Sequence, residues 1–185
     1  RDVERSRGLG DVYKRQIMLY ALCTALALAL LGLDQWVKHY VTVHIPLGEA
    51  QPLLPGLVEL RTVHNYGAAW SSFSGMRWLL VIVTGCIVLA VLALLVRRMV
   101  RHPLGVCACC LIVSGGLGNI LDRVRLGYVV DMFHLTFWPS YPVFNVADIC
   151  IVGGAVLGAV YYLWFYEKYD KKGISHGNPD AASQS

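Results

Sequence analysis

The stretch "WLLVIVTGCIVLAVLALLV", residues 78–96, runs for 19 residues without a charged side chain. A helix needs about 20 predominantly apolar residues to cross the hydrocarbon core of a bilayer. Residues 78–96 therefore predict a transmembrane helix, and they place the chain among membrane proteins before any other segment is considered.

Three other apolar segments extend this prediction to most of the chain. The 185 residues are 56% hydrophobic and their mean hydropathy is +0.53, which is high for a water-soluble domain. We predict an all-α integral membrane domain over residues 17–166, with four transmembrane helices at about 17–37, 78–96, 103–121 and 143–165. The first helix could instead be a cleaved signal peptide, because basic residues precede it, but its apolar run exceeds the roughly 7–15 residues typical of such peptides.

The two ends of the chain differ from its apolar middle. Residues 1–16 have no initiating methionine and no apolar periodicity, so we expect a disordered or non-native leader. Residues 167–185 end in the polar sequence "GISHGNPDAASQS" and are expected to form a disordered cytoplasmic tail.

The distribution of Lys and Arg predicts the orientation of the helices. The side of the membrane that holds both termini carries eleven of these residues and the other side five, or six against five without the leader. Because cytoplasmic loops are enriched in Lys and Arg, both termini are predicted to be cytoplasmic.

The connection after the first helix has the pattern of a small β unit. In "YVTVHI", residues 40–45, apolar and polar residues alternate, and "LVELRTV", residues 57–63, is rich in strand formers. "PLLPG" between them supplies a turn, so a β unit over about 40–63 is predicted on the outer surface. Aromatic residues in the connection 122–142 are typical of the lipid head-group region.

Polar residues recur at the outer ends of the predicted helices. Asn119 and Asp122 are three residues apart at the end of the third helix, and Asn145 and Asp148 repeat that spacing where the fourth begins. Residues three apart share a helix face. The same depth is expected for three more charged residues, Asp34 and Lys38 at the end of the first helix and Asp131 between the last two.

Small residues predict that the third and fourth helices approach each other closely. Ser114 and Gly118 form one small-xxx-small pair, and Gly154 and Gly158 form another. If these faces meet, the two Asn-Asp pairs converge at the outer surface, where a cleft between the two helices could receive a substrate.

Each polar residue also has a purely structural interpretation. Asp34 and Lys38 could be a simple i,i+4 ion pair, and Asp122 could pair with Arg123 or Arg125. Asn145 and Asp148 could cap the fourth helix, since both residue types favour helix N-termini. Several acids and amides at one membrane depth nevertheless favour a site.

Other kinds of site are not indicated. The six cysteines lie in apolar spans without zinc-site spacing, so they are interpreted as small packing residues and no metal is predicted. The net charge of +4 is spread over the membrane edges, which favours anionic lipid head groups, and no nucleic-acid partner is predicted. No serine or cysteine nucleophile motif and no HExxH motif is present.

Five motifs in order carry a resemblance to a known family. They are "DQWVK" at 34–38, "TVHNYGAAW" at 62–70, "GGLGNILDR" at 115–123, "GYVVDMF" at 127–133 and "FNVADICI" at 144–151. Together they resemble the bacterial lipoprotein signal peptidases, also called type II signal peptidases, over essentially all of residues 17–166.

The resemblance implies an aspartic endopeptidase of the bacterial inner membrane with its active site at the outer face. The family removes the signal peptide from prolipoproteins by cutting before a cysteine that carries diacylglycerol. Its catalytic pair matches Asp131 and Asp148, whose close carboxylates would share one proton. Its supporting or substrate-binding positions match Asp34, Lys38, Asn65, Gly67, Asn119, Asp122, Arg123 and Asn145.

The remaining expectations concern partners and rival functions. The resemblance implies lipid-modified prolipoproteins and membrane lipids as partners and no cofactor, and a monomer is expected. The sequence departs from the family pattern at Trp70 and Met132, where phenylalanine is usual. A small proton- or cation-coupled transporter and a non-catalytic membrane scaffold are the alternatives; an inverted repeat, typical of transporters, is not visible.

Overall fold

The computed structural model describes residues 2–68 and 72–171, with side chains from residue 14 onward. Trp70 and the tail segment 172–185 lie outside the described residues.

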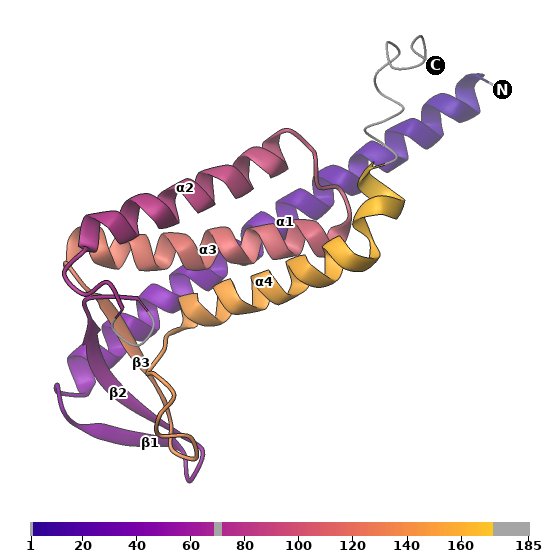
Figure 1. The fold of residues 1–185 in the computed structure, drawn as a ribbon. Helices are drawn as coiled ribbons and strands as arrows, with labels where there is room; N and C mark the ends of the chain where they lie inside the picture. The colour runs from indigo at the N-terminus through magenta and orange to yellow at the C-terminus, as the bar shows by residue number, and fades with distance from the viewer. Residues whose placement is uncertain (1, 69–71, 172–185) are drawn as a thin grey trace.

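Four long helices dominate the structure (Figure 1). They are α1 (Asp2–His44), α2 (Arg77–Val96), α3 (Pro103–Arg125) and α4 (Val146–Trp164). Each contains a segment long and apolar enough to cross a membrane, which confirms the predicted four-span architecture. The helix α3 lies at the centre and packs against the other three.

Within the described residues, both terminal segments contain helix. The helix α1 begins at Asp2, so residues 2–16 are helical where a disordered leader was expected. At the other end a short π-helix, η2 (Glu167–Lys171), follows α4, and its Asp170 is buried. The expected disordered tail therefore does not begin at residue 167.

A three-stranded antiparallel sheet lies at one end of the helices (Figure 1). Its strands, β1 (Ala50–Leu54), β2 (Val58–Asn65) and β3 (Val129–Leu135), are arranged in that order. The predicted strand over 57–63 is confirmed by β2. The third strand comes from the connection between α3 and α4, which the sequence analysis assigned to the head-group region. Pairing of β2 with β3 places Val63 opposite Asp131.

The predicted strand "YVTVHI" is wrong, because residues 40–44 lie at the end of α1 and Ile45 directly follows it. Val41 and Ile45 alternate with polar residues, but they are also four apart, which places them on one helix face. Both are fully buried against Val130 and Met132 of β3. Met132, one of the departures from the family pattern, is thus a core residue that joins the sheet to α1.

Glycines set the close approach of α3 and α4, although not entirely at the predicted positions. A Cβ atom added at Gly115 would lie 2.3 Å from the carbonyl oxygen of Ala147, and one at Gly154 would lie 2.9 Å from that of Ala108. Gly158 leaves ordinary contact distances, and Ser114 turns to α1, where its hydroxyl donates to the Ala27 carbonyl at 2.8 Å. The two helices therefore lie in backbone contact at these two glycines.

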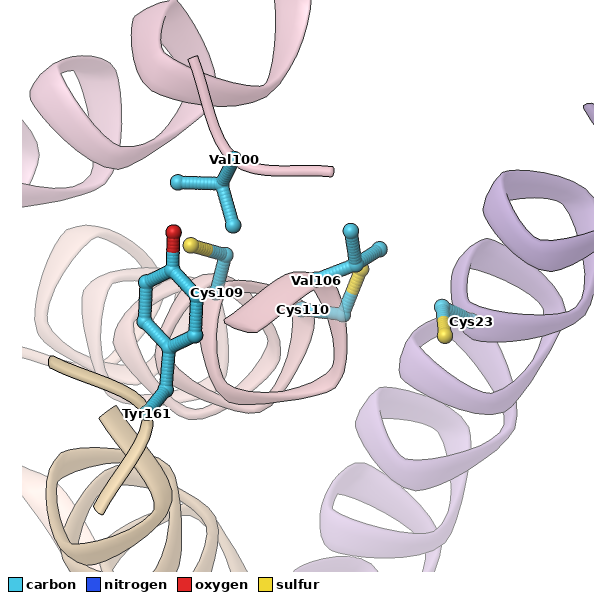
Figure 2. Packing of buried hydrophobic residues seen from close by; sticks show 6 residues of the cluster. All are labelled: Cys23, Val100, Val106, Cys109, Cys110 and Tyr161. Atoms are coloured by element: carbon cyan, nitrogen blue, oxygen red, sulfur yellow. The ribbon is translucent and has the colours of Figure 1, made fainter. Parts of the chain in front are cut away.

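A second core lies at the end of the bundle away from the sheet. Figure 2 shows six of its side chains. Cys23 of α1 and Cys109 and Cys110 of α3 are buried there, together with Val106 and Tyr161. This confirms the interpretation of these cysteines as small packing residues. Most of the buried charged side chains lie at the other end, beside the sheet.

Candidate active site between the sheet and the helices

A cavity of about 380 Å³ lies where β3 meets the helix ends. Asp131 and Asp148 line it together with Asn65, Asn119 and Arg123. The rest of its wall is mostly apolar and includes residues of α2 and α4. A polar site therefore lies beside a surface suited to an apolar ligand.

Asp131 is placed by the sheet. Its side chain is 2% exposed and accepts two hydrogen bonds, from Asn145 Nδ2 to Oδ1 at 2.6 Å and from Asn65 Nδ2 to Oδ2 at 2.9 Å. Burial, and secondly the negative charge of Asp148, raise the pKa of Asp131 to about 7. The two amides favour its charged form but do not reverse this effect.

Asp148 is placed by the start of α4. Asn145 is the N-cap residue, and its Oδ1 accepts from the Asp148 backbone N–H at 2.8 Å. In return, Asp148 Oδ2 accepts from the Asn145 N–H at 3.2 Å, which completes a capping box. The other carboxylate oxygen, Oδ1, accepts from Asn119 Nδ2 at 2.8 Å. The capping interpretation is thus confirmed, and Asp148 still faces the cavity.

Asn119 and Asn145 join the two acids into one network. Besides binding Asp131, Asn145 Nδ2 donates to Asn119 Oδ1 at 3.2 Å. The same oxygen accepts from Lys38 Nζ at 3.2 Å. Because each asparagine uses both its donor and its acceptor, the positions of Asp131 and Asp148 are coupled.

Lys38 connects this network to two further carboxylates. Its Nζ lies 2.8 Å from Asp34 Oδ2 and 2.9 Å from Asp122 Oδ2, and all three side chains are buried. Asp34 Oδ1 accepts from the Ala147 N–H at 2.8 Å, and Asp122 Oδ2 accepts from the Val130 N–H at 3.1 Å. The ion pair between Asp34 and Lys38 is therefore confirmed as part of a triad that ties α1 and α3 to α4 and β3.

The alternative pairing of Asp122 with Arg123 or Arg125 is wrong, since Asp122 pairs with Lys38. Arg123 turns the other way, and its Nη2 donates to the Gly67 carbonyl at 2.8 Å. The N–H of Gly67 donates to Asn65 Oδ1 at 2.9 Å, which fixes the amide that binds Asp131. Arg123 thus supports the segment after β2.

The structure brings all ten predicted site residues into this connected set. The sequence analysis missed one member, Gln35, whose Nε2 donates to Asp122 Oδ1 at 3.0 Å and to Asp34 Oδ2 at 3.2 Å. The available signal was an amide side chain directly after a predicted site residue, Asp34. Gly118 leaves the space that the Asp34 carboxylate occupies, because a Cβ atom there would lie 2.7 Å from Asp34 Oδ2.

Comparisons with known proteins agree with this geometry. Residues 26–165 match the family described as Signal peptidase (SPase) II. The lipoprotein signal peptidase of Streptococcus thermophilus is 42% identical over 137 residues, which cover 74% of this chain and 88% of that protein. That of Enterococcus faecalis is 37% identical over 164 residues, or 89% of this chain and 99% of that protein.

The fold also matches a bacterial membrane enzyme solved by the in meso method at 2.3 Å resolution. The two chains align with a TM-score of 0.73 and 26% sequence identity, over 77% of this chain and 88% of the other. The sequence family, the similar relatives and the fold all agree, and we conclude that this chain belongs to the signal peptidase II family.

Proposed function

We propose that this protein is an aspartic endopeptidase that removes the signal peptide from diacylglyceryl-modified prolipoproteins, cutting before the lipidated cysteine. Membership of the family and the names of its relatives support the substrate class. The observation that carries the aspartic mechanism is the convergence of Asp131 and Asp148 on one cavity, where Asn65, Asn119 and Asn145 hold their carboxylates.

Two neighbouring carboxylates can perform both proton transfers of peptide hydrolysis. Like charges at close range do not both ionise readily, so the pair keeps one proton near neutral pH. The ionised carboxylate accepts a proton from a water molecule as that water attacks the scissile carbonyl carbon. The protonated carboxylate donates a hydrogen bond to the carbonyl oxygen, and the leaving amine nitrogen then receives a proton.

The other members of the network act as positioning residues in this proposal. Asn119 and Asn145 hold the two carboxylates, while Lys38 forms ion pairs with both Asp34 and Asp122 behind them. Arg123 and Gly67 hold Asn65. Fixed donors of this kind need no reorientation during the reaction, which favours catalysis.

The apolar cavity wall suggests how the substrate reaches the acids. Leu80 and Thr84 of α2 and Ile151 and Val152 of α4 line the cavity. Glycine packing closes the interface of α3 and α4, so the signal helix would enter between α2 and α4. We further propose that both termini are cytoplasmic, that the active site and sheet lie at the outer face, and that the enzyme acts as a monomer in contact with membrane lipids.

A matched pair of substrates tests this function. Purified protein in bicelles is incubated with one precursor peptide in two forms, with and without diacylglycerol on its cysteine, and the products are identified by mass spectrometry. We expect cleavage before the cysteine in the lipidated peptide alone. Equal cleavage of both forms would contradict the substrate assignment, and cleavage of neither would favour a scaffold.

The transporter alternative receives no support from the relatives, which are peptidases by name. Proteoliposomes offer a direct comparison: a proton- or cation-coupled transporter changes the internal pH or cation content of the vesicles, whereas a peptidase does not.

A further inference from the structure

A groove lies between α1 and α2, separate from the candidate active site. Both helices pack on α3, and the space between them forms a cavity of about 600 Å³ that meets a deeper one of about 130 Å³. The two cavities share Thr24, Leu28 and Leu95, so they form one continuous groove. None of its lining residues lines the cavity of Asp131 and Asp148.

The groove has the length and composition that suit an acyl chain. Its α1 wall extends from Ile17 to Leu31, which at 1.5 Å per residue is roughly 21 Å. One leaflet contributes roughly half of the 30 Å hydrocarbon core. The walls consist mainly of Leu, Ala and Val side chains, and the groove lies within the membrane-spanning segments.

Arginine side chains mark one end of this groove. Arg98 lines the larger cavity beside Tyr20, whose hydroxyl donates to the Val100 carbonyl at 2.7 Å. Arg101 Nε donates to the Arg98 carbonyl at 3.1 Å, which brings a second guanidinium to the same turn. The nearby carboxylate of Asp170 is buried and already accepts from the Arg101 N–H, the His102 N–H and the Tyr161 hydroxyl.

The backbone conformation of Arg98 is a second, independent observation at this end of the groove. The N–H of Arg98 donates to the Leu95 carbonyl and that of Met99 to the Leu94 carbonyl, both at 3.0 Å, which is the Schellman pattern of a helix end. Arg98 occupies its left-handed position with φ of 54°, where glycine is the usual residue. An arginine held in a conformation unfavourable for a side chain suggests that its guanidinium has a role.

We propose that this groove binds one anionic glycerophospholipid, with an acyl chain along α1 and its phosphate at Arg98 and Arg101. Charge complementarity selects the occupant, because basic residues at the membrane edge attract anionic head groups. The proposal does not depend on the peptidase mechanism, since the groove and the candidate active site share no lining residue.

Two variants separate the head-group contact from the acyl-chain contact. Arg98→Gly removes the guanidinium while relieving the left-handed backbone, so its fold should be preserved. Ala21→Phe places a ring in the groove, whereas Ala29→Phe makes the same change on an exposed part of α1 that does not line it. Arg98→Lys retains a positive charge and should retain most of the preference.

Native mass spectrometry of the purified full chain provides the measurement. Delipidated protein is offered equimolar phosphatidylglycerol and phosphatidylcholine, with inorganic phosphate in a separate arm. We expect one retained lipid with about a fivefold preference for phosphatidylglycerol for each guanidinium contact. Arg98→Gly should lower that preference about fivefold, Ala21→Phe should lose the retained lipid, and Ala29→Phe should behave as wild type.

Several results would overturn the proposal. Equal retention of the two lipids by the wild type removes the head-group contact, and retention by Ala21→Phe equal to that of Ala29→Phe removes the groove as the site. Displacement of phosphatidylglycerol by inorganic phosphate alone would show that the arginines bind free anions and not a lipid.

Discussion

The two Asn-x-x-Asp pairs of this protein have the same spacing but lie at opposite ends of their helices. Asp148 is in the first turn of α4, where the positive end of the helix dipole and backbone N–H groups favour a carboxylate. Asp122 is in the last turn of α3, where the dipole disfavours one. Among the described residues, Asp122 has an ion pair with Lys38 and Asp148 has none.

This difference shows how one spacing supports two roles. Amides and a helix end hold Asp148 without neutralising it, so it remains available to exchange a proton. Lys38 forms an ion pair with Asp122, which also accepts hydrogen bonds from Gln35 and the Val130 N–H. The pair in α4 is therefore suited to chemistry, and the pair in α3 is suited to support.

The largest expected effect comes from replacing aspartate with asparagine in each pair and at Asp131. Asp148→Asn and Asp131→Asn keep the size of the side chain but remove its capacity to exchange a proton, so each should lower the rate of cleavage about a thousandfold or more. Asp122→Asn should retain measurable turnover while lowering thermal stability. Single-turnover cleavage of the lipidated peptide and thermal unfolding in detergent measure the two effects.

Folded yield serves as the control for this comparison, because all three variants must be tested as folded protein. Substantial turnover by Asp148→Asn, or a complete loss in a well-folded Asp122→Asn, would mean that the roles of the two pairs have been assigned the wrong way round.

A smaller effect is expected from removing the cation that distinguishes the pairs. Lys38→Met leaves Asp34 and Asp122 buried without their partner, which should lower the free energy of unfolding by about 3–5 kcal/mol. Lys171→Met removes an exposed lysine from another i,i+4 pair, with Glu167, and should leave the free energy of unfolding nearly unchanged, because solvent screens this pair. Denaturant unfolding in mixed micelles measures both, and equal effects of the two substitutions would refute the support role of Lys38.

The smallest expected effect is the response to pH near neutrality. With the pKa of Asp131 raised to about 7, the shared proton is lost as the pH rises through that value. The kcat/KM for the lipidated peptide should therefore fall about tenfold between pH 6 and pH 8. Asp122→Asn should keep this alkaline decline, because the substitution lies outside the proposed catalytic pair.

The same pKa has a consequence for stability with a defined sign. The folded state holds the Asp131 proton more tightly than the unfolded state, so this group contributes most at low pH. Its contribution is lost between the ordinary pKa of 3.8 and about 7. Thermal unfolding across this pH range should show the loss of stability in the wild type but not in Asp131→Asn. If activity does not decline at alkaline pH, Asp131 is excluded as the shared acid.

The sequence predicted the helices well because an apolar run of sufficient length has few alternatives to a membrane span. It did not predict how the connections pair. The strand β3 was missed, since "VVDMF" reads as one strand only once β2 lies beside it. The residues "YVTVHI" fit both a strand and a helix, and burial of Val41 and Ile45 against β3 determined the outcome.

The sequence predicted which residues belong to the candidate site, but not which of them interact with one another. Asparagine and aspartate at helix ends can be recognised from the sequence alone. That Asp122 pairs with Lys38 and not with Arg123 depends on how α1 packs against α3. Similarly, the sequence "SGGLG" does not show that Gly115 is the residue that meets the backbone of α4.

The position of Lys38 also bears on how the protein is made. Its two carboxylate partners belong to α1 and α3, which the ribosome completes before α4. The ammonium group of Lys38 can therefore pair with both carboxylates while the fourth helix is still being synthesised. Asp148 arrives last, together with Asn145, which joins it to Asp131. The ion pairs of Lys38 thus need only α1 and α3, whereas the proposed catalytic pair is complete only once the start of the final helix has been synthesised.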